Sequence, residues 1–131
     1  MARYLLIDDD AIIQFVHQRV IAQFDANCEV VALLTSHEAT SWLLDHEESL
    51  PDFIMLDINM PLQNGFEFLE SLEQCHAGLF HKLLRSTRVF LLTSLVNPLD
   101  LEQSQTHPMI EGLLSKPLSK EVLASLQDAG V

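Results

Sequence analysis

The sequence has little that would suggest an extracellular, membrane or nucleic-acid-binding protein. Its two cysteines, Cys28 and Cys75, lie far apart with no CxxC pattern, so we expect two buried thiols rather than a disulfide framework or a zinc site. Basic residues are scarce, with 7 Lys and Arg against 19 Asp and Glu. The net charge of −12 argues against binding to nucleic-acid phosphates or to an anionic membrane surface. No apolar run reaches the roughly 18 residues that span a bilayer. With no signal-peptide pattern at the amino terminus, we expect a cytoplasmic location and no nucleic-acid or membrane partner.

Apolar residues, in contrast, are plentiful, at 48% of the 131 residues, which is enough for the core of one ordinary domain. They form five short runs that are continuous rather than alternating, which is typical of strands buried on both faces of a parallel sheet. These runs are Tyr4–Ile7, Val30–Leu34, Phe53–Leu56, Val89–Leu92 and Leu113–Leu114. Helical patterns separate them. The alternation predicts an α/β fold in which helices cover both faces of a doubly wound, five-stranded parallel sheet.

Two details of the helices are predictions that a structure can test. In the first helical segment, Ile12, Phe15 and Val16 recur at a spacing near 3.6, so we expect them on its buried face. Residues 75–87 are ambiguous, because they could extend the third helix or form a separate turn. The six histidines show no metal-like spacing, and we expect them at the surface. They are His17, His37, His46, His76, His81 and His107.

Polar residues stand where the predicted strands end. In an open α/β sheet, ligands bind at the carboxyl ends of the strands, so these residues are the first candidates for a site. Asp8, Asp9 and Asp10 follow the first strand, and Asp57 ends the third, with Asn59 two residues later. Thr93 and Ser94 end the fourth strand, and Lys116-Pro117 follows the fifth. Asp10 has a simpler interpretation, as the N-cap of the first helix.

Asp8, Asp9 and Asp57 would bring three negative charges into a small space. Like charges at short range repel and raise pKa values, so such a cluster requires cations. A Mg²⁺ ion and Lys116 would balance it, and Mg²⁺ prefers oxygen ligands and often binds one or two carboxylates together with a phosphate. The alternatives are structural. An Asp-Asp pair before a helix can cap it, Lys-Pro is often a solvated turn, and Thr93, or Ser94 beside it, can simply end a strand.

Four motifs, in order along the chain, resemble the receiver domain of response regulators in two-component signalling. They are Leu5–Asp10, Asp57–Pro61 with Gly65 beyond it, Leu92-Thr93, and Lys116-Pro117. The resemblance covers essentially the whole chain. It implies a flavodoxin-like sheet of strand order 2-1-3-4-5 with five helices. It further implies that residues 1–131 are one stand-alone receiver domain with no effector domain, and that the Lys116-Pro117 bond is cis.

The resemblance also implies a function. Asp57 would accept a phosphoryl group in a Mg²⁺-dependent reaction from the phosphohistidine of a sensor histidine kinase or a histidine phosphotransfer protein. Asp9 and Asp57 would bind the metal directly, Asp8 mostly through water, and Asn59 through its backbone carbonyl. The sequence has neither a GxxxxGK[ST] nor a GxGxxG motif for ATP. The protein would catalyse its own phosphorylation and dephosphorylation rather than turn over a separate substrate.

The resemblance also implies how the phosphoryl group is bound and how the signal is relayed, and in the relay this chain departs from the family. Thr93 and Lys116 would each bind a phosphoryl oxygen. The family often relays the signal through this threonine and an aromatic residue three positions before the lysine, where this chain has Leu113. The output would be phosphorelay or phosphorylation-dependent binding to an unidentified protein target.

Two other functions are weighed against this one. A phosphorylation-independent adaptor that keeps the fold would fit Leu113, although such a protein does not need three carboxylates facing one lysine. A small phosphatase with an aspartyl nucleophile would typically carry a second acid two residues after it, where this chain has Asn59.

Overall fold

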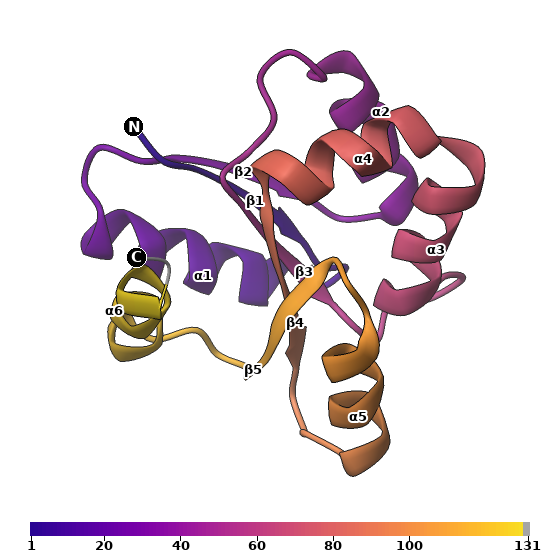
Figure 1. Cartoon of the computed structure of the whole chain (residues 1–131). Coiled ribbons are helices and arrows are strands. Elements are labelled where there is room, and N and C mark those ends of the chain that lie inside the picture. The colour runs from indigo at the N-terminus through magenta and orange to yellow at the C-terminus, as the bar shows by residue number, and fades with distance from the viewer. Residues whose placement is uncertain (130–131) are drawn as a thin grey trace.

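The structure, a computed structural model, describes residues 1–129 and contains one five-stranded parallel sheet (Figure 1). The strand order is β2-β1-β3-β4-β5, which confirms the predicted doubly wound topology. The strands are β1 Arg3–Ile7, β2 Glu29–Leu33, β3 Phe53–Asp57, β4 Arg88–Thr93 and β5 Ile110–Ser115. Each lies within a few residues of its predicted run. All adjacent pairs are parallel, so the five carboxyl ends share one edge of the sheet.

Helices cover both faces of this sheet (Figure 1). They are α1 Ala11–Phe24, α2 Ser36–Asp45, α3 Gly65–Cys75, α4 Ala77–Ser86, α5 Pro98–Thr106 and α6 Lys120–Ala129. Side chains from α2, α3 and α4 pack in one apolar cluster, and side chains from α1 and α6 pack in a second. None of the helices within residues 1–129 combines the length and apolarity needed to cross a membrane.

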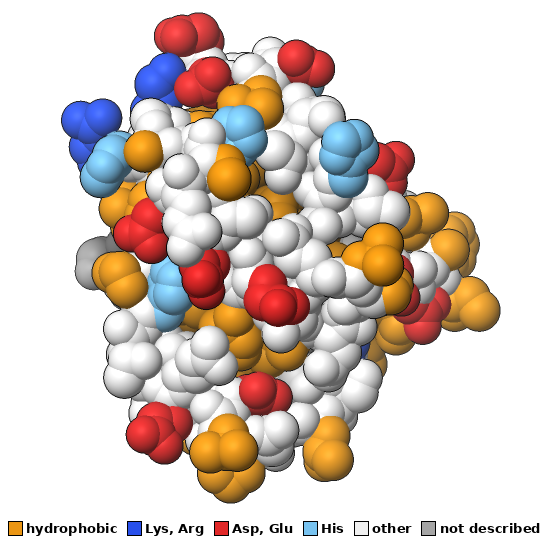
Figure 2. Space-filling model, turned by 90° about the vertical axis from the view of Figure 1, so that its right-hand side faces the viewer, with side chains coloured by type: hydrophobic (Ala, Val, Ile, Leu, Met, Phe, Trp, Pro, Cys, Tyr) orange, Lys and Arg blue, Asp and Glu red, His pale blue; other side chains and the backbone are white. Residues whose placement is uncertain are grey.

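The strand sequences are apolar throughout because both of their faces are covered. Along β1, Leu5 and Ile7 point into the cluster beneath α2–α4, whereas Tyr4 and Leu6 point into the cluster beneath α1 and α6. All four side chains are at most 1% exposed. The surface is acidic, and Figure 2 shows Asp and Glu side chains scattered over one face with few basic groups among them.

The expected number of helices was wrong by one, since residues 1–129 contain six instead of five. The ambiguous residues 75–87 form a helix of their own, α4, which buries Leu79, Phe80 and Leu83. His76 separates it from α3 and ends that helix with a backbone conformation outside the helical region. The chain can therefore turn at this residue and lay a second amphipathic helix on the sheet.

The predicted buried face of α1 was also wrong. Ile12 and Phe15 are 76% and 59% exposed, and the residues that α1 buries are Gln14, His17 and Ile21. His17, expected at the surface, is only 1% exposed. The helix is thus rotated so that two polar side chains face the sheet, where backbone groups bind them, as described below.

Several local predictions are confirmed. The Asp10 carboxylate accepts hydrogen bonds from the backbone N–H groups of Ile12 and Ile13 and caps α1. The Lys116-Pro117 bond is cis. Cys28 and Cys75 are free thiols, but the expectation that both are buried was wrong, since Cys28 is only partly buried and Cys75 is exposed.

Candidate metal and phosphoryl site

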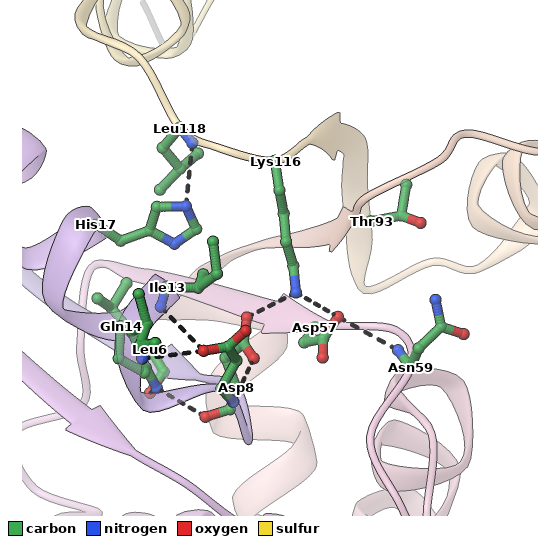
Figure 3. Close-up of polar contacts among 12 residues, drawn as sticks. Leu6, Asp8, Ile13, Gln14, His17, Asp57, Asn59, Thr93, Lys116 and Leu118 are labelled. Atoms are coloured by element: carbon green, nitrogen blue, oxygen red, sulfur yellow. Dashed lines mark hydrogen bonds and ion pairs between the residues drawn. The ribbon is translucent and has the colours of Figure 1, made fainter.

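Three charged side chains from three strand ends meet at the carboxyl edge of the sheet (Figure 3). Asp57 is the last residue of β3, Asp8 follows β1, and Lys116 follows β5. The Lys116 ammonium Nζ lies 2.7 Å from Oδ2 of Asp8 and 2.9 Å from Oδ1 of Asp57. Both carboxylate side chains are 3% exposed and that of Lys116 is 10% exposed. The parallel topology therefore joins residues up to 108 positions apart in one buried charge cluster.

Backbone groups hold the two carboxylates in place. The N–H of Asp10 donates to Oδ1 of Asp8 at 2.9 Å, and the N–H of Asn59 donates to Oδ1 of Asp57 at 3.3 Å. Gly65 begins α3 directly behind Asp57, and a Cβ atom there would lie 2.9 Å from the Asp57 carbonyl oxygen. The approach of α3 to the end of β3 thus requires a glycine at this position.

Burial and the neighbouring charges shift the pKa values of both Asp57 and Lys116. Burial raises the pKa of Asp57, and the nearby Asp8 charge adds to that effect, whereas the hydrogen bond from Lys116 opposes it. Burial alone would lower the pKa of Lys116, but its hydrogen bonds to Asp8 and Asp57 outweigh this and raise its pKa. The ammonium therefore stays charged, and the carboxylate of Asp57 lies in surroundings that only partly compensate its charge.

A third carboxylate completes an acidic group suited to a cation. Asp8, Asp9 and Asp57 each offer an oxygen, and these atoms lie within 4.8 Å of one another. Three negative charges against the single ammonium of Lys116 leave an excess of two, which a divalent cation would balance. Oδ2 of Asp8 is buried, and its close partner within residues 1–129 is the Lys116 ammonium at 2.7 Å. Asp9 is exposed, so the group opens to solvent. An all-oxygen donor set of this kind fits Mg²⁺.

Other predicted site residues lie at the same edge but outside the ion-pair cluster. Thr93 ends β4, and its hydroxyl bonds within its own loop, donating to the Leu95 carbonyl at 3.1 Å and accepting from the Leu95 N–H at 3.3 Å. Asn59 contacts Asp57 through its backbone N–H. Leu113, where the resemblance led us to look for an aromatic residue, is partly buried and packs against the apolar core.

Two residues near the site were not predicted from the sequence. The side-chain amide of Gln14 lies 3.2 Å from the Asp8 carbonyl oxygen and 2.9 Å from that of Leu33. The imidazole of His17 accepts the backbone N–H of Leu118. A polar residue on an amphipathic helix is normally assigned to solvent, so only the tertiary structure identifies these two as buried.

Comparison with known proteins identifies the same fold and family. The family model for the response regulator receiver domain matches residues 4–127. A two-component response regulator from Cytophaga hutchinsonii is 27% identical, with a TM-score of 0.88 over 98% of this chain and 96% of that one. A response regulator receiver protein from Dyadobacter fermentans is also 27% identical, with a TM-score of 0.83 over 98% and 97% of the two chains.

A curated relative is longer than this chain. "Probable C4-dicarboxylate response regulator DctR" from Halalkalibacterium halodurans is 31% identical over 74 residues, which are 56% of this chain and 31% of that protein. The matched region thus spans about a third of the relative's length. Receiver domains are in general Mg²⁺-dependent and are phosphorylated by histidine kinases or phosphotransfer proteins. This chain belongs to the receiver domain family of two-component response regulators, with a structure consistent with a phosphoacceptor role.

Proposed function

We propose that this protein accepts a phosphoryl group on Asp57 and that the modification controls its interaction with a protein partner or its place in a phosphorelay. The observation that carries the proposal is the position of Lys116 Nζ, 2.7 Å from Asp8 and 2.9 Å from Asp57. A buried pair of carboxylates sharing one ammonium is costly for stability. Such an arrangement is understandable where the charges serve the chemistry of a site.

In the proposed step an oxygen of Asp57 attacks the phosphorus of a phosphohistidine. A new P–O bond forms, the P–N bond breaks, and the electron pair of that bond leaves with the histidine nitrogen of the donor. Both contacts described above for Asp57 use Oδ1, so Oδ2 is the candidate nucleophile. In dephosphorylation, water would attack the same phosphorus atom, the P–O bond to Asp57 would break, and inorganic phosphate would leave while the carboxylate is regenerated. The protein is in this sense a catalyst of its own phosphorylation and dephosphorylation.

Phosphoryl transfer depends mainly on positioning and on neutralising charge at the phosphoryl oxygens. Lys116 would bind one of these oxygens, moving only slightly from its place between the two carboxylates. Thr93 would bind another once its hydroxyl leaves Leu95. The leucine at position 113 has no hydroxyl or aromatic ring, so we expect the β4–α5 loop backbone, rather than an aromatic side chain, to transmit the change at Thr93.

The acidic group would hold Mg²⁺ through carboxylate oxygens of Asp9 and Asp57, through water on Asp8, and through the backbone carbonyl of Asn59. When bound, the ion would neutralise charge on the carboxylates and on a phosphoryl oxygen. The partners in this proposal are a sensor histidine kinase or a histidine phosphotransfer protein upstream and an unidentified protein downstream. A cytoplasmic location is part of the same proposal.

Phosphotransfer from purified histidine kinases tests the proposal. Each kinase is first labelled with radioactive phosphate and then mixed with the protein and Mg²⁺, with Asp57→Asn as the control variant. We expect at least one kinase to pass its label to the wild type and none to label the variant. Label that stays on every kinase, or that reaches the variant equally, would contradict the proposal. Partner binding unaffected by Asp57→Asn and by beryllofluoride would instead favour the adaptor.

A further inference from the structure

The sheet-facing side of α1 is polar at the end nearest the acidic group. The buried residues of this helix are Gln14, His17 and Ile21, and only the last is apolar. A buried polar side chain is costly unless it is hydrogen-bonded. The amide nitrogen of Gln14 meets this requirement at the ends of β1 and β2, where it donates to backbone carbonyls. The amide oxygen of Gln14 is buried with no hydrogen-bond partner within residues 1–129. His17 is hydrogen-bonded to a different part of the chain, the segment between β5 and α6, which carries Lys116.

The imidazole of His17 binds a backbone group across 101 positions of the sequence. Its Nε2 lies 3.1 Å from the nitrogen of Leu118 and accepts that N–H, a contact visible in Figure 3. Leu118 is 2% exposed, so its N–H would be a buried donor without this acceptor. Because Nε2 accepts, the proton of the neutral ring belongs on Nδ1. Burial and the nearby Lys116 charge lower the pKa of His17, more than the Asp8 charge raises it, which favours this neutral form.

Leu118 stands two residues after Lys116, and the segment between β5 and α6 is held at both ends. The N–H of Lys116 donates to the Thr93 carbonyl at 2.8 Å, which fixes the segment to β4. The N–H of Leu118 donates to His17, which fixes it to α1. The lysine side chain leaves the backbone between these two attachments. Its ammonium must then reach Asp8 and Asp57 at the distances observed.

We propose that His17 is a positioning residue for Lys116. By accepting the Leu118 N–H, it holds the β5–α6 segment against the helix that begins directly after the acidic residues of β1. The ammonium is thereby kept between the two carboxylates. The predicted consequence for phosphoryl transfer rests on the function proposed above, whereas the positioning of Lys116 can be measured without any phosphorylation.

Three variants separate this role from a general contribution to folding. His17→Leu fills a similar volume but cannot accept the Leu118 N–H, and His17→Gln offers an amide oxygen near the position of Nε2. Thr87→Val is the matched structural control. It removes another buried long-range hydrogen bond, in which the Thr87 hydroxyl donates to the Pro51 carbonyl at 2.7 Å, at the opposite edge of the sheet. All are compared at a temperature where circular dichroism shows each to be folded.

The first readout is the side-chain ¹⁵N resonance of the Lys116 ammonium in metal-free protein, assigned with Lys116→Arg. We expect the resonance to be visible in wild type, because the group is buried and paired. It should shift or broaden away in His17→Leu, return in His17→Gln, and stay unchanged in Thr87→Val. An unchanged resonance in His17→Leu, or an equal change in Thr87→Val, would overturn the proposal.

The second readout is the rate of phosphorylation by acetyl phosphate with saturating Mg²⁺, followed by intact mass. We expect a loss of roughly tenfold in His17→Leu, the scale of a small misplacement of a reacting group. The rate in His17→Gln should recover to within about threefold of wild type, and Thr87→Val should leave it unchanged. A full rate in His17→Leu would contradict the proposed positioning role. No adduct in wild type from this donor or from any histidine kinase would contradict the phosphoacceptor function instead, and the resonance would still decide the role of His17.

Discussion

The two edges of the β-sheet differ in how their charged side chains are paired and buried. At the amino ends of the strands, Arg3 pairs with Glu29 at 3.0 Å and Arg88 pairs with Glu111 at 2.9 Å. These side chains are 24–43% exposed, and each pair is neutral. Pairs of this kind are screened by water and contribute modestly to stability.

At the carboxyl ends, the charges are buried and do not balance. Three carboxylates lie close together, one ammonium pairs with two of them, and those two, Asp8 and Asp57, are almost fully enclosed. The amino edge thus uses its ion pairs to hold the fold, whereas the carboxyl edge carries an electrostatic cost that a bound cation and a phosphoryl group would relieve. Variants at the two edges should therefore affect different properties.

The largest difference should appear when one cation is removed from each edge. Lys116→Met should lower the rate of phosphorylation by acetyl phosphate at least about 100-fold, because a preorganised positive group near the reacting oxygens is lost. Arg88→Met should leave that rate unchanged, although it removes a half-exposed ion pair. Intact-mass time courses of both variants give the rates. Equal losses in the two variants would mean that the edges do not differ in this way.

Magnesium should stabilise the protein through the carboxyl edge alone. At a free Mg²⁺ concentration about 100 times its Kd, the free energy of unfolding should rise by about 2.7 kcal/mol. The effect should be greatly reduced in Asp57→Asn and kept in Glu111→Gln, whose acid lies at the amino edge. Urea unfolding with and without a chelator measures it. A Mg²⁺ effect of the same size in Asp57→Asn would place the cation elsewhere.

Two glycines provide a matched test of close packing at the site. Gly65→Ala puts a Cβ atom 2.9 Å from the Asp57 carbonyl oxygen and should lower the free energy of unfolding by about 2 kcal/mol, with a slower phosphorylation rate. A Cβ atom at Gly78, on α4, meets nothing within 4 Å, so Gly78→Ala should raise stability by about 0.5 kcal/mol. Chemical denaturation of both variants checks the signs. A neutral Gly65→Ala would show that α3 can retreat from β3 without cost.

A smaller effect than that of Gly65→Ala concerns the charge of Asp57 itself. Since burial raises its pKa in the folded state, the folded protein binds this proton more tightly than the unfolded chain does. Stability from this group is therefore lost as pH rises from the ordinary value through the raised pKa. In metal-free protein at pH 7, Asp57→Asn should be more stable than wild type, because the amide has no buried charge to desolvate. The gap should close as pH falls below the raised pKa. Unfolding curves from pH 3 to 8 measure this difference in stability. A difference that stays constant, or that changes sign, would contradict the prediction.

Much of the fold and of the carboxyl edge could be predicted from the sequence, because their signals are local. A strand buried on both faces must be apolar throughout, and the polar residues that follow such strands are confined to one edge. This is how Asp8, Asp57 and Lys116 could be expected to meet. The cap at Asp10 is likewise a local interaction, with the next few backbone N–H groups.

The orientation of α1 could not be predicted, because distant parts of the chain determine it. Its spacing of apolar residues indicated a buried stripe through Ile12 and Phe15, yet both are exposed. Gln14 and His17 are buried instead, since their partners are backbone groups from β1, β2 and the β5–α6 segment. No local pattern reports such partners. The separate helix α4 was missed for a related reason, as His76 ends α3 without a glycine or proline to mark the break.

Intact-mass analysis with peptide mapping tests the central claim most directly. Wild type and Asp57→Asn are incubated with Mg²⁺ and a phosphodonor, either acetyl phosphate or a phosphorylated histidine kinase. We expect one phosphoryl group on the peptide that contains Asp57. It should not form when a chelator is present, and it should be absent from the variant. A wild type that remains unmodified by every donor, or a variant that gains the same mass, would contradict it.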